Sequence, residues 1–277
     1  MSAAARLSGL IEGLGSGPVF VHSDAFRAAR LVGPVRERGA LLSRHLDLLA
    51  DAAGGRGLWM PEFNYGFPRT KTYDVAATPT DLGPIPEAFR TGRAEWRTPV
   101  PMFSAAGTGA EPELEWGDET DPFGPRSIFA KLVEADGVIL WYGNTFSAST
   151  LIHYAEGKRG PAYRYDKIFP GVVVMPGGES VPGSLKAHVR PLGAGLEYAW
   201  DRLEREATDA GVARRMEGNS EVLAANARAI CDFWDEKMLD DRLSLLDDKS
   251  RRWVEPALED VGRRFIITDF EAGEPLV

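Results

Sequence analysis

His153 and Glu156 stand three residues apart in a stretch whose pattern predicts the start of a helix. Residues at i and i+3 of a helix share one face, with Cβ atoms about 5–6 Å apart, so Glu156 can accept a hydrogen bond from one imidazole nitrogen. The other nitrogen remains free as a base. A neighbouring carboxylate is expected to raise the histidine pKa toward physiological pH, which suits proton removal from an amine, a hydroxyl or water. A surface ion pair has the same spacing, so the spacing alone leaves both interpretations open.

The residues before this pair predict the elements that position it. Residues 137–142 form a short apolar run that is rich in β-branched and aromatic side chains and bounded by glycines, which predicts a buried strand. The polar residues that follow can accept hydrogen bonds from the first turn of a helix, so we expect a helix to begin among Asn144, Thr145, Ser147 and Ser149. On that helix Thr150, His153 and Glu156 stand at i, i+3 and i+6.

Length and composition are those of a globular protein. The chain has 277 residues, of which 44% are apolar and 26% charged, and we expect one domain over residues 1–277 with a helical C-terminal portion at 196–262. No apolar run approaches the roughly 20 residues that span a bilayer, and the N-terminus lacks the layout of a secretory signal. We therefore expect a cytoplasmic protein. The single cysteine, Cys231, excludes an internal disulfide and is expected to be buried.

Charge and motif content narrow the classes of partner. Acidic residues number 41 and basic residues 32, and no basic block stands out, so neither nucleic acid nor a membrane surface is expected as a partner. The four histidines are scattered and no zinc motif is present, so no metal is expected. Neither the Walker pattern nor G-x-G-x-x-G occurs, which argues against a nucleotide-binding P-loop or Rossmann domain. The oligomeric state stays open, a homo-oligomer included.

The other three histidines occupy different kinds of predicted element. Residues 18–21 predict a strand that ends at His22 and Ser23, and ligands of open α/β sheets bind beyond such carboxyl ends. His22 is either a site residue or a hydrogen-bonded cap. His45 lies in an amphipathic helix over residues 41–53 and is expected to be structural. His188 is expected to alternate outward from a strand over 187–190.

Further elements are expected along the chain. Six prolines between Phe63 and Phe103 predict long ordered loops, which are more often functional than idle in a compact domain. The remaining expectations are a helix over 3–13, a short helix at 86–90, a helix before residue 134, strands at 58–60, 172–175 and 265–267, a helix capped by Asn219 or Ser220 that runs to Met238, and another around 253–261.

The proline-rich segment resembles the aminoglycoside 3-N-acetyltransferase family. Residues 73–80, Gly83 and residues 85–90 resemble the family signature F-D-x-x-x-T-P-S … G-x-I-P-E-x-F-R, and residues 97–107 resemble R-S-x-H-P-x-x-S-F-x-A-x-G. Three further matches are Val21-His22-Ser23 at the first strand end, Phe123-Gly124 with Ser127 for F-G-x-x-S, and Thr150, His153 and Glu156 for T-S-L-H-x-A-E. Five motifs in the right order cover roughly residues 19–156, and together they are specific.

The resemblance implies a fold, a reaction and a set of roles. The fold is α/β, with three layers around a central mixed sheet, long proline-rich active-site loops and a helical C-terminal part. The reaction is transfer of an acyl group from a coenzyme A thioester, with acetyl-CoA as co-substrate, to an amine of an amino sugar. His153 is then the general base, oriented by Glu156. The positions near coenzyme A are His22, Ser23, Thr78, Ser104 and Ala105.

The sequence departs from the family pattern, and other functions stay open. Val100 precedes Pro101 where the family has a histidine, and little after Gly157 can be matched. A nucleotide-linked amino sugar or an amine of secondary metabolism is therefore an alternative acceptor. A hydrolase could use Ser149 or Ser104 with His153 and Glu156, although no G-x-S-x-G is present. A non-catalytic small-molecule binding protein of the same fold is the third alternative.

Overall fold

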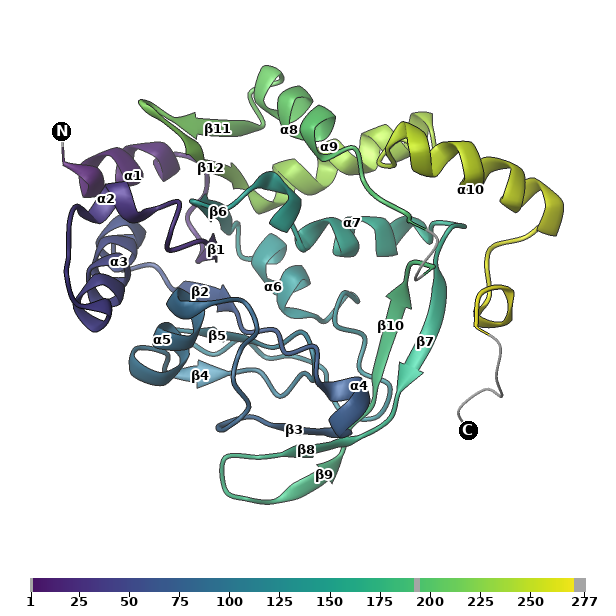
Figure 1. Cartoon of the computed structure of the whole chain (residues 1–277), viewed down its shortest axis with the longest axis horizontal. Coiled ribbons are helices and arrows are strands. Elements are labelled where there is room, and N and C mark those ends of the chain that lie inside the picture. Colours follow the sequence, from purple (N-terminus) through teal and green to yellow (C-terminus); the bar gives the residue numbers. More distant parts are fainter. Residues whose placement is uncertain (1, 192–194, 272–277) are drawn as a thin grey trace.

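The computed structural model describes residues 2–191 and 195–271, and a seven-stranded mixed sheet forms its centre. The strand order is β11-β12-β6-β1-β2-β5-β4, in which β6, β1 and β2 are parallel and the remaining pairs are antiparallel (Figure 1). The bounds are β1 Val19–Ser23, β2 Leu58–Pro61, β4 Trp96–Arg97, β5 Ala105–Gly107, β6 Val138–Tyr142, β11 Ala213–Met216 and β12 Asn219–Asn226.

Helices cover both faces of this sheet, which confirms the three-layer α/β fold. The strands alternate: Val138 and Leu140 of β6 pack with one group of helices, whereas Ile139 and Trp141 pack with the other. The first group comprises α1 (Ala3–Ile11), α2 (Ala29–Val32), α3 (Arg38–Ala53) and α5 (Pro84–Gly92). The second comprises α6 (Ile128–Glu134), α7 (Leu151–Arg159), α8 (Trp200–Asp209), α9 (Ala227–Asp240) and α10 (Asp248–Val261).

The order in which strands are added reverses at β1, so the carboxyl ends of β1 and β6 form a switch point of the sheet. After β1 the chain runs through α3 to β2 on one side of β1, and it later returns to β6 on the other side. Ligands of open α/β sheets bind at such a point. Gly143 makes the turn after β6 with φ 70°, and a Cβ there would lie 2.7 Å from the Asp24 carbonyl oxygen, so only glycine fits.

Two smaller sheets flank the central one, to its right and below it in Figure 1. One pairs β7 (Tyr165–Phe169) with β10 (Leu185–Val189), and the other has the order β3-β8-β9. The latter strands are β3 Thr72–Asp74, β8 Val172–Val174 and β9 Ser180–Pro182, and α4 (Phe67–Thr70) precedes them. The predicted strands at 172–175 and 187–190 therefore exist, but β9 separates them and they belong to different sheets.

The C-terminal portion is helical, as expected, but it also supplies two strands of the central sheet. The prediction that Asn219 or Ser220 caps a helix is wrong, because residues 219–226 form β12, paired with β6. The helix cap is Asn226, whose side chain accepts from the N–H groups of Arg228 and Ala229. Residues 222–225 are buried on both faces of the sheet, and such an apolar run cannot be distinguished from a helix by periodicity.

Two other predicted elements differ in their form. The predicted strand at 265–267 is wrong: Phe265 is buried against Trp253, with the ring planes 3° apart, and Ile267–Asp269 form a 3-10 helix. The short helix at 86–90 begins earlier, with Pro84 rather than Pro86 at its first position. Within residues 2–191 and 195–271, no helix combines the length and apolar character needed to cross a bilayer.

Candidate active site

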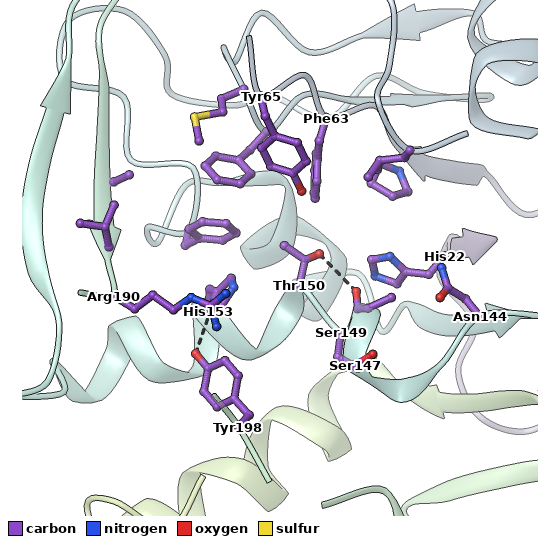
Figure 2. A pocket seen from close by; sticks show the side chains of 18 of the residues that line it. His22, Phe63, Tyr65, Asn144, Ser147, Ser149, Thr150, His153, Arg190 and Tyr198 are labelled. Carbon is purple, nitrogen blue, oxygen red and sulfur yellow. Dashed lines mark hydrogen bonds between the residues drawn. The ribbon is translucent and has the colours of Figure 1, made fainter. Parts of the chain in front are cut away.

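A cavity of about 670 Å³ lies at the carboxyl ends of β1 and β6, between α7 and the proline-rich loops. Figure 2 shows Thr150 and His153 of the α7 region on one wall and Phe63 and Tyr65 on the facing wall. His22, Asn144 and Ser147 mark one end. The lining also contains Ser23, Phe103, Phe123, Arg164, Tyr198 and Trp200, with His188 to Arg190 from β10.

The helix that carries His153 exists, but it begins just after the polar residues 144–149 among which the sequence predicts its start. A 3-10 turn at Phe146–Ala148 leads into α7, which starts at Leu151. The hydroxyls do not cap the helix. Ser149 Oγ donates to the Phe146 carbonyl, and Thr150 Oγ1 donates to the Ala148 carbonyl at 3.3 Å. The turn thereby fixes the direction in which α7 leaves the sheet.

The pair predicted from spacing forms at the base of the cavity. His153 Nδ1 lies 3.4 Å from Glu156 Oε2, and the imidazole is 30% exposed whereas the carboxylate is 1% exposed. The edge of the ring meets Phe123, with centroids 5.1 Å apart. Among the described residues, all polar contacts of the ring are made by Nδ1, and Nε2 is not among the buried atoms without a partner, so we infer that Nε2 is open to the cavity that His153 lines. The carboxylate is therefore buried behind the ring, and the pair is not a surface ion pair.

Three other residues hold the Glu156 carboxylate. Tyr163 donates to Oε1 at 2.5 Å, Tyr198 donates to Oε2, and Arg164 Nε lies 3.0 Å from Oε2. Burial alone would raise the pKa of Glu156, but the Arg164 charge and the hydrogen bonds from His153 and Tyr163 lower that pKa to about 2. Burial raises the pKa of both tyrosines well above the usual value, so they remain donors. Glu156 is therefore an anion at physiological pH.

The pKa of His153 is lowered, so the expectation that it is raised is wrong. Burial is the largest cause and the Arg164 charge the second, and together they outweigh the opposing effect of Glu156. Arg164 NH2 and Tyr198 OH lie 3.1 and 3.2 Å from His153 Nδ1. The Arg164 guanidinium can only donate to Nδ1 and the Glu156 carboxylate can only accept from it, so these contacts fit both neutral tautomers. A base at Nε2 requires the tautomer with the proton on Nδ1.

His22 and Ser23, the last residues of β1, also line the cavity. Burial lowers the pKa of His22 to about 3, so its ring is neutral. Within the described part of the chain, neither His22 Nε2 nor Ser23 Oγ has a hydrogen-bond partner. No hydrogen bond therefore supports the interpretation of His22 as a cap, and both side chains remain candidates for binding a ligand.

The structure places the other three predicted coenzyme A residues behind the cavity wall. Ser104 Oγ donates to the Glu62 carbonyl at 2.7 Å, and the Thr78 carbonyl accepts from Arg97 at 2.6 Å. The Ala105 N–H donates to Thr98 Oγ1 at 2.9 Å. None of the three is part of the lining that the described residues form. Contact between coenzyme A and Thr78, Ser104 or Ala105 stays a prediction.

The remaining motif residues brace the loops around the cavity. Glu87 pairs with Arg90 at 2.6 Å, and Arg90 also donates to the Ala76 carbonyl, which ties α5 to the loop before it. Phe123 lines the cavity, and Ser127 caps α6 by accepting from the Ala130 N–H. Val100 is buried in a separate apolar cluster and does not line the cavity. The position of the family histidine is thus outside this lining.

The positions of two further histidines and of the cysteine can be compared with those predicted. His45 is buried on the other face of the sheet, where its Nδ1 lies 2.7 Å from Tyr142 OH, which confirms its structural role. His188 does not point outward as expected, because the β7–β10 pair forms a wall of the cavity and places this side chain in the lining, 20% exposed and paired with Asp166. Cys231 is buried in α9, as expected.

The hydroxyls proposed for a hydrolase are directed elsewhere. Ser149 Oγ donates to the Phe146 carbonyl and Ser104 Oγ donates to the Glu62 carbonyl, so both bind backbone oxygens. Neither forms a hydrogen bond to His153 among the described residues. An activated nucleophile requires that bond to its base, so the geometry does not favour the hydrolase.

Sequence reasoning missed Tyr163, Arg164 and Tyr198, the residues that hold the Glu156 carboxylate. The first two follow α7 in an aromatic-arginine-aromatic run at 163–165. This run was the one feature of the sequence that could have indicated them. Tyr198 comes from a loop beyond β10 and matches no motif. A buried arginine and two buried tyrosines around one glutamate could be recognised only after folding.

Glu62 is a second buried carboxyl group, and it follows β2 between Pro61 and Phe63 of the cavity wall. Its side chain is fully buried, and neither carboxyl oxygen has a hydrogen-bond partner among residues 2–191 and 195–271. Burial raises the pKa of Glu62 to about 9, against the opposing charge of Arg97. The group is therefore neutral in the folded protein at pH 7 and ionised in the unfolded chain.

We expect Glu62→Gln to stabilise the protein at neutral pH. A carboxyl whose folded pKa is raised reduces stability above its unfolded pKa, so the loss grows as pH rises from about 4.5 toward 9. At about 1.4 kcal/mol per pH unit, glutamine should raise the free energy of unfolding by up to about 3 kcal/mol at pH 7 and leave it unchanged near pH 4. Urea titrations at both pH values measure this difference. Glu259→Gln, on the exposed side of α10, is the control, and equal stability of Glu62→Gln and wild type at pH 7 would contradict the prediction.

The fold is that of an α/β enzyme, and its cavity lies at the switch point of the sheet with His153 in the lining. Residues 49–239 match the model of the aminoglycoside 3-N-acetyltransferase family, and the chain belongs to that family. Aminoglycoside N(3)-acetyltransferase VII of Streptomyces paromomycinus is 28% identical over a 263-residue alignment that covers 82% of this chain and 88% of the relative. Aminoglycoside N(3)-acetyltransferase VIII of Streptomyces fradiae is 37% identical over 101 residues, which are 33% of this chain and 35% of that relative.

Solved structures share the fold. Aminoglycoside acetyltransferase AAC(3)-Xa has a TM-score of 0.66 at 19% identity and covers 85% of this chain and 92% of its own. AAC-IIIb, solved as a binary complex with CoASH, has a TM-score of 0.66 at 23% identity and covers 87% of this chain and 95% of its own. At these identities the likeness concerns the fold.

Proposed function

We propose that this protein transfers an acetyl group from acetyl-CoA to an amine of an amino sugar, with His153 as general base. Membership of the family supports the class of reaction. The observation that carries the proposal is the placement of His153, which lines the cavity with Nε2 toward it and a buried, ionised Glu156 behind it. No group of three or more potential metal ligands occurs among the described residues, and the proposed chemistry uses none.

The reaction can be written with these groups alone. The neutral amine of the acceptor attacks the thioester carbonyl while His153 Nε2 takes the proton that the nitrogen loses. The new C–N bond forms, the C–S bond breaks, and the sulfur leaves as a thiol with the proton that the imidazolium returns. Glu156, held by Arg164, Tyr163 and Tyr198, stabilises the imidazolium between the two steps.

We assign coenzyme A to the polar end of the cavity. His22 and Ser23 offer unpartnered polar atoms there, and Asn144 and Ser147 lie at the same end (Figure 2). Thr78, Ser104 and Ala105 would then support the loop behind the wall instead of touching the ligand. One solved structure of the same fold is a complex with CoASH. Use of acetyl-CoA also accords with the expected cytoplasmic location, which stays a prediction.

Thiol release from acetyl-CoA with a panel of amines tests the proposed function. The panel includes apramycin and gentamicin, which are bound in solved structures of the same fold, together with monoamino sugars and a nucleotide-linked amino sugar. We expect thiol release only when an amine is present. The amount of thiol should equal the amount of acetylated amine found by mass spectrometry. Release without amine would identify a hydrolase, and absence of release with every amine would identify a binding protein.

A further inference from the structure

The charges in the cavity lining are few and compensated. Among the described residues the charged side chains that line it are Arg164, Arg190 and Glu197. Arg164 lies against Glu156, and Glu197 Oε2 accepts from Arg190 at 3.1 Å. The lining therefore offers an incoming ammonium group no carboxylate that lacks a cationic partner.

Asp166, a carboxylate behind the β10 wall, is compensated as well. Asp166, on β7, accepts from His188 Nδ1 at 2.7 Å. Lys186 and Arg264 lie 3.9 and 3.6 Å from its oxygens. A ligand with several ammonium groups needs several free carboxylates, because each buried charge without a counter-charge is unfavourable. This part of the wall supplies none.

Aromatic rings make up much of the same lining. Phe63, Tyr65 and Phe103 contact one another edge to face, with centroid distances of 5.3 to 6.4 Å. Phe123 continues the cluster, 4.9 Å from Phe103. Tyr65 is 52% exposed although it lines the cavity, so part of its ring is open to a ligand. Aromatic surface of this kind binds flat apolar groups.

The labelled residues distinguish two ends of the cavity. His22, Asn144 and Ser147 lie at the polar end, which the proposed function assigns to coenzyme A, whereas His153 and Arg190 lie toward the opposite end (Figure 2). Ala187 and Val189 of β10, Met102 and Phe103 also line the cavity. The cavity that His153 lines therefore offers an acceptor apolar side chains beside its compensated charges.

We propose that the acceptor is a monoamine: an amino sugar with one amino group and an aryl or similar apolar aglycone that packs on Phe63, Tyr65 and Phe103. This inference rests on the proposed acetyl transfer and narrows its acceptor. The single amine faces His153 Nε2 in its neutral form, so the site needs no free carboxylate to hold it. A polyamine would retain ammonium groups on its other amines, which the compensated lining does not match.

Acceptor competition tests the inference. The purified protein is assayed for thiol release with 4-nitrophenyl glycosides that carry one amino group on the second, third or fourth ring carbon, and with apramycin and gentamicin. We expect kcat/KM for the best aryl glycoside to exceed that of both polyamines by about tenfold or more. Equal or faster turnover of the polyamines, lost in His153→Ala, would overturn the inference and leave the proposed function intact. Turnover of neither class would count against both.

Tyr65 variants separate acceptor binding from coenzyme A binding. Tyr65→Ala should raise KM for the aryl glycoside by about tenfold and leave KM for acetyl-CoA unchanged, because the ring is lost from the acceptor side. Tyr65→Phe keeps the ring and should keep both values. Leu239→Ala, an exposed apolar truncation on α9, is the control. A rise in KM for acetyl-CoA instead would assign the aromatic wall to the pantetheine arm and overturn the inference.

Discussion

Replacement of His153 by alanine is expected to lower kcat/KM for acetyl transfer by about 10³-fold, within the roughly 10²–10⁴-fold range of general-base catalysis. The imidazole is the one side chain of the described lining that faces the cavity with a buried carboxylate behind it, and its lowered pKa keeps it unprotonated at pH 7. Because the ring is 30% exposed, its removal should leave the fold and the binding of acetyl-CoA nearly unchanged. Steady-state thiol release at saturating acetyl-CoA, with a thermal melt of each variant, measures this effect.

The pH profile and a control on the same helix make the test specific to a base. With an acceptor whose amine has a low pKa, the acidic limb of log kcat/KM for the wild type should have its midpoint below the usual histidine value of about 6.5. His153→Ala should lose that limb. Lys158→Ala, on the exposed side of α7, should keep both rate and profile. Retention of more than about a tenth of the wild-type rate by His153→Ala would refute the general-base role.

The second large effect concerns stability. Glu156→Gln is expected to lower the free energy of unfolding by about 3–5 kcal/mol, because it leaves the buried guanidinium of Arg164 without its counter-charge. Acetyl transfer should fall as well, since His153 loses the anion that stabilises its imidazolium. Urea unfolding at pH 7 gives the stability difference. If the variant is as stable as the wild type, the ion pair between Glu156 and Arg164 does not contribute this stability.

The double variant Glu156→Gln with Arg164→Met separates the unpaired charge from the lost packing. It removes both charges, so a part of the lost stability should return even though activity does not. Tyr163→Phe is the milder comparison, because it removes one donor to Glu156 Oε1 and no charge. A double variant less stable than Glu156→Gln alone would contradict the explanation from an unpaired charge.

The same carboxylate makes stability depend on pH in a defined window. The folded pKa of Glu156, about 2, lies below the ordinary value of about 4.5, so its contribution is fully present above pH 4.5. That contribution, about 3 kcal/mol at about 1.4 kcal/mol per unit, should disappear as pH falls from about 4.5 to 2. Glu156→Gln should lack this part of the acid dependence. The direction is opposite to that of Glu62, whose folded pKa is raised.

The sequence by itself determined the local features of the site. The spacing of His153 and Glu156, the apolar run of β6 and the polar turn after it are short-range patterns, and helix and strand periodicity convert them directly into neighbouring side chains. The strand end at His22 and Ser23 was predicted for the same reason. The likeness of residues 19–156 to a known family supplied the class of reaction. In the structure, the residues of its motifs brace or line one cavity.

Only the tertiary structure decided how the pair is tuned. Arg164 and Tyr198 reach Glu156 from outside α7, and their positions depend on how the β7–β10 pair and the following loop pack. The direction of the His153 pKa follows from burial and from Arg164, and neither can be inferred from spacing on one helix. The positions of Thr78 and Ser104 behind the wall, and of β12 inside the sheet, likewise result from long-range packing, which local sequence periodicity does not encode.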